Sequence, residues 1–518
     1  MKRKSIYSIS LFLLTLTACT KKYEKINTNA NAIVNPGAGE LPFLFTRAED
    51  QAMFSTSYQV AQNLNADQYA QYFACESTSF PSDRYVMRSD WFNSAWLRLY
   101  TGVVPQLQTI FAQTDPNSSQ YALANIVWVL AFHRITDYWG PIPYFKVGQP
   151  GTSVPYDGQD KIYDDFFKRL TTAVNVLKTK TGETPFSSYD IIFGGKVDKW
   201  IKFANTLRLR LALRISKVDP VRAKTEAEAA YAAGVMAASP DDDALLQKSL
   251  NGGDINGLAQ MSDWNEFRMS AAMESVLKGY KDPRMPIYFL PAVNTGTYEG
   301  LRNGLTATQL TLPANSVKAN SHVGARWSSP AAGGITDFQI TPQNVMCSAE
   351  AWFLRAEGAL LGWNMGGTPK SLYESGITQS LKQWGITDNT TITAYINGIT
   401  PAIAPGDYLN SPALVSFPVL FDPVNPAVQQ AQISMQKWLA LFPDGCEAWA
   451  DYRRSKSFSL YPIANSDNPD VTDPSKQWIR RLSFLQQEFD NNSAAMGPAV
   501  DLLKGPDKIT TPLWWDKN

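Results

Sequence analysis

Few residues in this chain are of a type and spacing that would support catalysis. His133 lies within an apolar helical pattern, where a packed core histidine is expected, and His322 lies in a polar loop without a nearby Gly-x-Ser-x-Gly elbow. Asp241-Asp242-Asp243 is more simply a solvated acidic turn than half of a glycosidase carboxylate pair. The sequence has no His-Glu-x-x-His motif, no Walker loop and no Gly-x-Gly-x-x-Gly. Catalysis therefore has no positive support, and a surface glycan hydrolase stays a less favoured alternative.

Aromatic side chains offer a better route to function, because they can bind a ligand without catalysing anything. Sugar rings present flat C–H faces that pack on indole and phenol rings, while their hydroxyls take directed hydrogen bonds from polar side chains. The chain has 15 tryptophans and 22 tyrosines. The candidate ligand contacts in the long irregular stretches are Trp264, Tyr298 and Trp327, with Asn303 and Arg326 as polar contacts. Trp91 and Trp96, in an earlier segment that carries Ser, Asp and Arg, are further candidates. The alternative for each is an anchor that fixes its loop on the scaffold.

Cys19 has a different chemistry, which is acylation. A positive segment, Met1-Lys2-Arg3-Lys4, precedes an apolar run from Ile6 to Thr17 that is too short to span a bilayer, and Leu16-Thr17-Ala18-Cys19 follows. Residues 1–18 are therefore predicted to be a signal peptide. The box resembles that of bacterial lipoproteins, in which the cysteine carries fatty acyl chains such as palmitate and becomes the mature N-terminus. More than one chain is needed for stable anchoring.

Composition excludes several other classes of function. Removing residues 1–18 takes away three basic and no acidic side chains, which leaves a formal charge of −3. No global field then points to nucleic acid or to anionic lipid. Cys75, Cys347 and Cys446 are too few for a disulfide framework and lack metal-ligand spacing. At most one disulfide is possible, and buried free thiols are the favoured state. We also expect no metal and no cofactor.

The elements that must position these residues are mostly helical. Residues 19–40 are polar and aperiodic and are predicted to be a flexible tether. Beyond them, apolar residues at helical spacing recur in paired segments: 121–136 with 161–177, 200–216 with 221–236, and 350–361 with 371–384. Long stretches rich in Gly, Pro, Asn, Ser and Thr, 237–345 and 386–428, interrupt them. We predict one mainly α domain over residues 41–518, a tetratricopeptide-like helix-pair scaffold with long irregular loops.

Several short strings follow one another along this scaffold. They are Asp137-Tyr138-Trp139-Gly140-Pro141-Ile142-Pro143-Tyr144, Gly194-Gly195-Lys196-Val197-Asp198-Lys199-Trp200, Leu207-Arg208-Leu209-Arg210, Asp282-Pro283-Arg284, Ala356-Glu357, Gln436-Lys437-Trp438, Glu447-Ala448-Trp449-Ala450-Asp451-Tyr452-Arg453-Arg454, Arg480-Arg481-Leu482 and Trp514-Trp515-Asp516. In this order they resemble the SusD/RagB family of Bacteroidetes outer-membrane lipoproteins, in particular its SusD-like branch. The resemblance covers nearly the whole mature chain.

The resemblance implies a fold of four tetratricopeptide-like helix pairs whose elaborations carry a ligand site. It also implies a nutrient-binding lipoprotein that sits on a SusC-like TonB-dependent barrel and captures oligosaccharides or, in some members, peptides. Thr20-Lys21-Lys22 follow Cys19 where surface-exported relatives often carry acidic residues. Outer-membrane attachment is therefore expected, and outward display rests on the resemblance.

The strings themselves indicate scaffold rather than ligand contact. Glu447 and Asp451 share a helix face at i, i+4, where like charges repel unless cations lie between them, and Arg454 follows three residues later. We expect a structural ion network there. Trp139-Gly140-Pro141 predicts a rigid turn that ends a buried helix.

Overall fold

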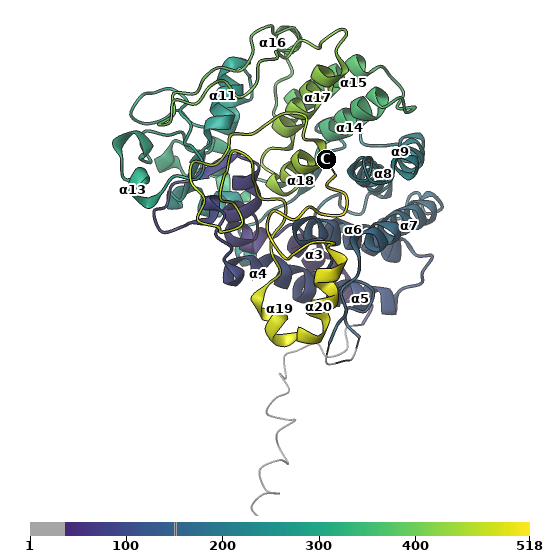
Figure 1. Ribbon diagram of the computed structural model, residues 1–518. Helices are drawn as coiled ribbons and strands as arrows, with labels where there is room; N and C mark the ends of the chain where they lie inside the picture. Colours follow the sequence, from purple (N-terminus) through teal and green to yellow (C-terminus); the bar gives the residue numbers. More distant parts are fainter. Residues whose placement is uncertain (1–36, 150, 152, 518) are drawn as a thin grey trace, which may run out of the picture. The chain divides into compact units, whose positions relative to one another are not determined.

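The computed structural model describes residues 37–149, 151 and 153–517, so Cys19 and most of the predicted tether lie outside the described residues (Figure 1). Helix α6 (Ser119–Trp139) and helix α7 (Gln159–Lys178) form the first predicted pair. The Ser118 hydroxyl accepts a hydrogen bond from Tyr121 N–H and begins α6. Gly140, with φ of 88°, ends it immediately before Pro141. The predicted turn is thus confirmed.

The other predicted pairs are also present. Helices α8 (Val197–Arg214) and α9 (Pro220–Ala233) form the second, and α14 (Ser348–Leu360) and α15 (Pro369–Gln383) form the third. Pro369 occupies the first turn of α15 behind a Thr368 capping box, as its position in the sequence indicates. Helices α17 (Pro426–Leu441) and α18 (Gly445–Ser455) follow, and the pairs pack on one another through α7 with α8, α8 with α14, and α14 with α17 (Figure 1). This confirms the helix-pair scaffold.

The remaining elements are short and belong mostly to the irregular stretches. The further α-helices are α3 (Leu41–Ala52), α4 (Ser89–Leu97), α5 (Val104–Gln113), α10 (Gly257–Met261), α11 (Ala271–Gly279), α12 (Met285–Tyr288), α13 (Ala307–Leu310), α16 (Asn389–Ile396), α19 (Gln486–Asn491) and α20 (Ser493–Leu502). Two π-helical segments are η2 (Gln59–Asp67) and η4 (Arg98–Val103). The 3₁₀ turns are η1 (Ser55–Ser57), η3 (Ser82–Arg84), η5 (Ser187–Tyr189), η6 (Asn251–Gly253), η7 (Ser262–Trp264), η8 (Pro313–Asn315), η9 (Ala325–Trp327), η10 (Pro330–Ala332) and η11 (Phe338–Ile340).

Two small antiparallel sheets tie distant stretches together. Strand β1 (Phe73–Cys75) pairs with β3 (Phe267–Met269), with Phe73 opposite Met269. Strand β2 (Ala244–Leu246) pairs with β4 (Gln343–Met346). Within the described part of the chain, no helix is both long and apolar enough to cross a membrane.

A network of buried charges, which we call the buried ion network, lies where the helix pairs meet. Its first half joins Asp137 of α6, Arg210 and Arg214 of α8, Glu350 of α14 and Glu447 of α18. Arg210 donates to both oxygens of Glu350 at 2.6 Å, and Arg214 lies 2.6 Å from Glu447. Burial raises the pKa of Glu447 to about 7 against the opposing effect of the two arginines.

The second half of the buried ion network continues along α18. Asp451 lies 2.9 Å from Lys437 and 2.8 Å from Arg454, and Glu357 lies 3.0 Å from Lys437. Burial alone would raise the pKa of Asp451, but Lys437 and Arg454 hold it below its ordinary value. The predicted structural ion network is confirmed, and it extends well beyond α18.

The acidic turn at residues 241–243 corrects one prediction. Asp242 and Asp243 are buried rather than solvated, and only Asp241 is exposed. Asp242 pairs with Lys202 at 2.7 Å, and Asp243 accepts a hydrogen bond from Ser348 N–H at 2.7 Å, at the beginning of α14. A carboxylate at a helix N-terminus is stabilised by the exposed amides and the helix dipole, so this turn is part of the scaffold.

Other predictions about single residues hold. His133 is buried within α6, where its Nδ1 lies 3.1 Å from Val129 O, and burial holds the pKa of its imidazole well below the ordinary value. Cys75, Cys347 and Cys446 are buried free thiols.

Candidate ligand-binding site

The best candidate site is a cavity of about 250 Å³ between α18, the end of η2 and the loop that follows α18. We call it the aromatic pocket. Seven side chains that form its walls matter here: Tyr69, Gln71, Tyr85, Trp449, Tyr452, Tyr461 and Trp478. Its volume is just below the roughly 300–1,000 Å³ common for small-molecule sites.

The rings of the aromatic pocket brace one another. Trp449 and Tyr452 are three residues apart on α18 and therefore share a helix face. Tyr69 packs edge-on against Trp449 with the ring centroids 5.2 Å apart, and Tyr452 packs edge-on against the half-buried Trp478 at 5.2 Å. Edge-to-face packing adds to the stability that burial gives, so the pocket presents largely fixed ring surfaces.

Two residues of the aromatic pocket have unusual backbone conformations. Gln71 and Tyr85 have φ of 54° and 66°, a left-handed region that residues other than glycine seldom adopt. The turn at Gln71 is closed by hydrogen bonds from Gln71 N–H to Gln68 O and from Tyr72 N–H to Asp67 O. Eight other non-glycine residues of the described chain also have positive φ, so this conformation fixes the two pocket residues without by itself marking a functional site.

Three polar atoms of the aromatic pocket's residues are buried without a hydrogen-bond partner in the described structure. They are the Tyr69 hydroxyl, the Gln71 Oε1 and the Trp449 Nε1. Neighbouring polar atoms are paired, since Gln71 Nε2 donates to Tyr461 O and the Tyr461 hydroxyl donates to Pro412 O. Buried polar atoms in folded proteins almost always have a partner, and these three are almost completely enclosed, so in this conformation a buried water rather than a ligand hydroxyl suits them.

The electrostatics of the aromatic pocket favour a neutral ligand. Of the residues described along its walls, Lys476 alone is charged at neutral pH, and its ammonium lies 2.9 Å from Asp473. Burial raises the pKa of the Tyr69, Tyr85 and Tyr452 phenols. These phenols therefore stay protonated and able to donate hydrogen bonds.

The residues proposed from the sequence lie elsewhere and are not brought together. Trp264 is exposed over 49% of its surface, and Tyr298 is half-buried. Trp91 is half-buried against Phe80, with the Arg88 guanidinium 4.4 Å from its ring centroid. These three keep accessible ring surface, and their contact with a ligand stays a prediction.

The other candidates are more enclosed. Trp96 is buried in a second pocket with Tyr100, and the Asn303 amide donates to Gln68 O and Phe73 O. Arg326 is half-buried with its guanidinium 5.4 Å from the Trp384 ring centroid.

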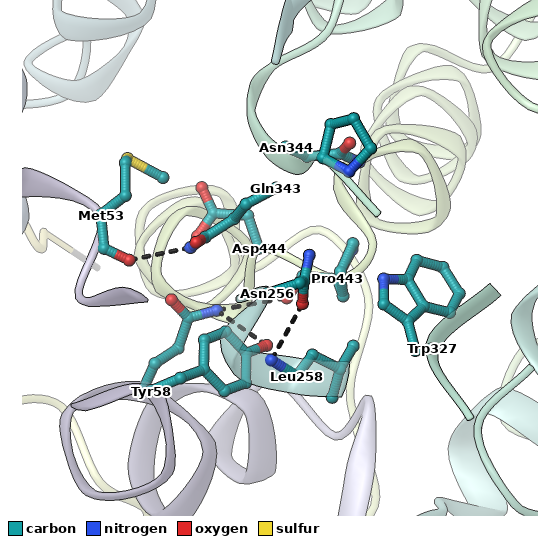
Figure 2. Close-up of a pocket in the computed structure, with 11 residues that line it drawn as sticks. Met53, Tyr58, Asn256, Leu258, Trp327, Gln343, Asn344, Pro443 and Asp444 are labelled. Atoms are coloured by element: carbon teal, nitrogen blue, oxygen red, sulfur yellow. Dashed lines mark hydrogen bonds between the residues drawn. The ribbon is translucent and has the colours of Figure 1, made fainter. Parts of the chain in front are cut away.

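Trp327 borders a cavity of about 10 Å³, which is about the space that one water molecule needs. Figure 2 shows its indole at one side of this cavity, across from Tyr58 and beside Asn256 and Pro443. Only 2% of the Trp327 surface is exposed, so in this conformation the ring packs rather than binds a sugar.

Sequence reasoning missed the aromatic pocket because its residues look like scaffold or lie far apart. Trp449 and Tyr452 belong to a string assigned to scaffold, and Tyr69 is 380 positions before Trp449. One signal was available: the i, i+3 aromatic pair on α18 is followed by Tyr461 and Trp478 in a Pro- and Ser-rich loop. In the described residues, no group of three or more His, Cys, Asp or Glu could hold a metal ion.

Comparisons with known proteins agree with this architecture. The family model described as SusD-like, "Susd and RagB outer membrane lipoprotein", matches residues 26–516. A chitin-binding SusD homolog from Flavobacterium johnsoniae is 34% identical, with a TM-score of 0.84 over 92% of this chain and 99% of that chain. A SusD-like protein from Bacteroides thetaiotaomicron is 31% identical, with a TM-score of 0.82 over 92% and 99%. A SusD homolog from Bacteroides vulgatus is 31% identical, with a TM-score of 0.83 over 93% and 98%. No curated protein matches the chain.

Proposed function

The chain belongs to the SusD-like family of outer-membrane lipoproteins, and on that premise we propose that it captures oligosaccharides and delivers them to a SusC-like TonB-dependent transporter. The observation that carries the binding half of this proposal is the aromatic pocket. Its two half-buried rings, Tyr452 and Trp478, offer apolar surface, and deeper in its walls the Tyr69 hydroxyl, Gln71 Oε1 and Trp449 Nε1 lack partners in the described structure. A sugar ring has an apolar face that packs on aromatic rings, and its hydroxyls donate and accept hydrogen bonds.

Chitin-type oligosaccharides are the first ligands to test. One solved homolog, from Flavobacterium johnsoniae, is itself chitin-binding. The near-neutral walls of the aromatic pocket suit uncharged N-acetylated or plain hexose chains better than polyanionic ones. Trp478, half-buried in the pocket wall, would stack on a sugar ring, with the half-buried Tyr452 ring beside it.

Binding without catalysis is the mode we favour. A glycosidase needs two carboxylates that face each other across the bond to be cut, whereas the described wall residues of the aromatic pocket include no Asp or Glu. Incubation of the purified protein with each oligosaccharide should leave it intact. Cleavage products would overturn the binding-only proposal.

The membrane anchor and the partner complete the proposal. Acylated Cys19 would hold the protein on the outer membrane, facing outward, and residues 20–40 would let the body move over a transporter barrel. Cys19→Ala should release the protein from the membrane fraction with its ligand binding unchanged. The barrel should co-purify with the wild-type protein; recovery of the protein without any barrel after mild solubilisation would contradict the partnership.

Isothermal titration against matched panels tests the ligand class. The panels are N-acetylglucosamine oligomers, neutral glucans, and peptides of similar length. We expect saturable heat with at least one glycan series and affinity that increases with the number of sugar units. Heat with peptides alone would contradict the glycan proposal and favour peptide capture. Silence with every ligand, together with co-purification of the barrel, would favour a purely structural lid.

A further inference from the structure

A second cavity, of about 340 Å³, lies between α4, η4, the segment after α6 and the α19–α20 hairpin. We call it the Trp96 pocket. Its walls include Trp96, Tyr100, Pro143, Val154, Glu488 and Asn492. None of these residues lines the aromatic pocket, so the two cavities are separate sites.

One carboxylate in the Trp96 pocket is held in place. Glu488 Oε2 accepts hydrogen bonds from the Tyr156 hydroxyl at 3.1 Å and from Asn492 Nδ2 at 3.2 Å. Asn492 is itself fixed, since its Oδ1 accepts from Ser153 Oγ at 2.7 Å and from Val154 N–H at 3.0 Å. Glu488 is therefore a positioned acceptor rather than a freely rotating surface side chain, and its Oε1 is left for a ligand.

This carboxylate has no counter-ion. Among the described residues, no Lys, Arg or His nitrogen lies within 4 Å of a Glu488 oxygen, whereas Asp137, Glu350 and Glu447 in the buried ion network each have such a partner. Both groups that hold Glu488 are neutral. A half-buried negative charge without a cation attracts one, because the low-dielectric surroundings strengthen the interaction.

The rings beside Glu488 favour a cation of a particular kind. Trp96 is wedged between Trp139, with centroids 5.5 Å apart, and Tyr156, at 6.1 Å. Tyr100 lies 4.7 Å from Trp96, and its hydroxyl is tied to Pro143 O at 2.7 Å. Indole and phenol faces attract organic cations through their quadrupoles, and the apolar walls would bury the rest of such a molecule.

We propose that the Trp96 pocket binds a small organic cation: a protonated amine on an apolar or ring-shaped body. The ammonium lies against Glu488 and the half-buried Tyr100 ring, while the body packs on Pro143, Val154 and the small part of the Trp96 ring that its neighbours leave open. This goes beyond oligosaccharide capture, because it assigns a charged ligand to a different cavity. The site and the aromatic pocket are then independent.

Three probes of the same shape test the charge preference. They are 2-phenylethylammonium, neutral 2-phenylethanol and the anion phenylacetate, each titrated into the full mature protein and followed by calorimetry and tryptophan fluorescence. We expect the amine to bind at least about tenfold more tightly than the alcohol, a difference of about 1.4 kcal/mol, and the anion not to bind. Equal affinity for amine and alcohol, or no binding of the amine, would overturn the proposal.

Glu488→Gln tests the role of the carboxylate. Glutamine keeps the size and one acceptor oxygen for Tyr156 and Asn492, so the fold should persist, which an unchanged melting temperature would verify. We expect at least about a tenfold loss of amine affinity and no change in oligosaccharide binding. Glu374→Gln, on α15 where Glu374 lies 3.5 Å from Lys370, is the matched control and should leave amine affinity unchanged. Full amine affinity in Glu488→Gln would refute the assignment.

Discussion

The buried ion network and the aromatic pocket differ in how their buried polar groups are paired. Each charged side chain of the network has an oppositely charged partner within 4 Å, and several pairs approach to 2.6 Å. In the aromatic pocket, Tyr69, Gln71 and Trp449 each leave a buried polar atom unpaired in the described structure. The helix pairs therefore obtain a fixed scaffold by pairing opposite charges, although Asp137 Oδ2 and Arg214 Nε, 3.2 Å apart, also make no hydrogen bond in the described structure. The pocket instead encloses its unpaired atoms among neutral rings.

Of the variants considered, one that breaks the buried ion network should lower the free energy of unfolding most. Arg210→Met removes the partner that donates to both oxygens of Glu350, and both side chains are about 1% exposed. A buried carboxylate left unpaired costs about 3–5 kcal/mol of the free energy of unfolding, measured by urea denaturation. Lys224→Met is the control: Lys224 is half-exposed and lies 3.9 Å from Glu228, so the loss should be below about 1 kcal/mol. Similar losses in both variants would show that the network is not special.

Removing a ring from the pocket should affect binding rather than folding. Trp478→Ala removes a half-buried aromatic ring from the wall of the aromatic pocket. Burying such a ring against a ligand is worth about 1.5–3 kcal/mol, so oligosaccharide affinity measured by calorimetry should fall roughly 10- to 100-fold. Trp264→Ala, at an exposed tryptophan outside this pocket, is the control and should bind normally. The reverse result, loss in Trp264→Ala alone, would move the site to the loop predicted from the sequence.

Asp67 provides a third case for this comparison, because it is a buried carboxylate without a cation within 4 Å in the described structure. It accepts from the Tyr58 hydroxyl at 2.8 Å and from Gln62 at 3.0 Å, and burial raises its pKa from 3.8 to about 7. The folded protein therefore holds this proton more tightly than the unfolded chain. The resulting stability is fully present below about pH 4 and is lost as the pH rises through about 7.

The test is urea denaturation of the wild type and of Asp67→Asn at pH 5 and pH 8. The wild type should lose about 1 kcal/mol or more of this contribution on going to pH 8. Asp67→Asn should show a smaller difference between the two pH values, because its side chain does not titrate. The same pH dependence in both proteins would rule out Asp67 as a source.

Gln71→Gly should give the smallest changes in stability and in oligosaccharide affinity. Glycine adopts the φ of 54° without strain, but it loses conformational entropy on folding and the hydrogen bond that Gln71 Nε2 donates to Tyr461 O, so we expect a net loss of about 1 kcal/mol of the free energy of unfolding. The variant also lacks Oε1, so oligosaccharide affinity should fall several-fold, as expected for one hydrogen bond worth about 0.5–1.5 kcal/mol. Unchanged affinity by calorimetry would mean that Gln71 serves the turn and not the ligand.

The contrast also explains what could be predicted from the sequence. Helix pairs follow from local spacing and caps, such as Tyr163 and Leu170 on one face of α7 and Pro369 at the beginning of α15. The ion network was visible in part because Glu447, Asp451 and Arg454 are neighbours on one helix. The burial of Asp243 could not be predicted, because its partner, Ser348 N–H, lies 105 positions away in the sequence.

The ligand site was beyond sequence reasoning for the same reason. Whether a tryptophan packs or binds depends on the atoms that surround it, and Trp327 in a candidate loop proves to be nearly fully buried. Trp449, Tyr452 and Trp478 lie close in sequence, but only tertiary contacts bring them beside Tyr69 and Tyr85.

That composite construction of the aromatic pocket has a practical consequence. Its walls come from stretches near residues 69–85, 449–462 and 474–479, so the cavity exists only when the chain has closed on itself. A molecule that binds there favours the folded state over the unfolded one, by about 2.7 kcal/mol when its concentration is 100 times Kd. The melting temperature of the whole protein then reports occupancy, and a thermal-shift screen of glycan fractions could identify the cargo before its chemistry is known.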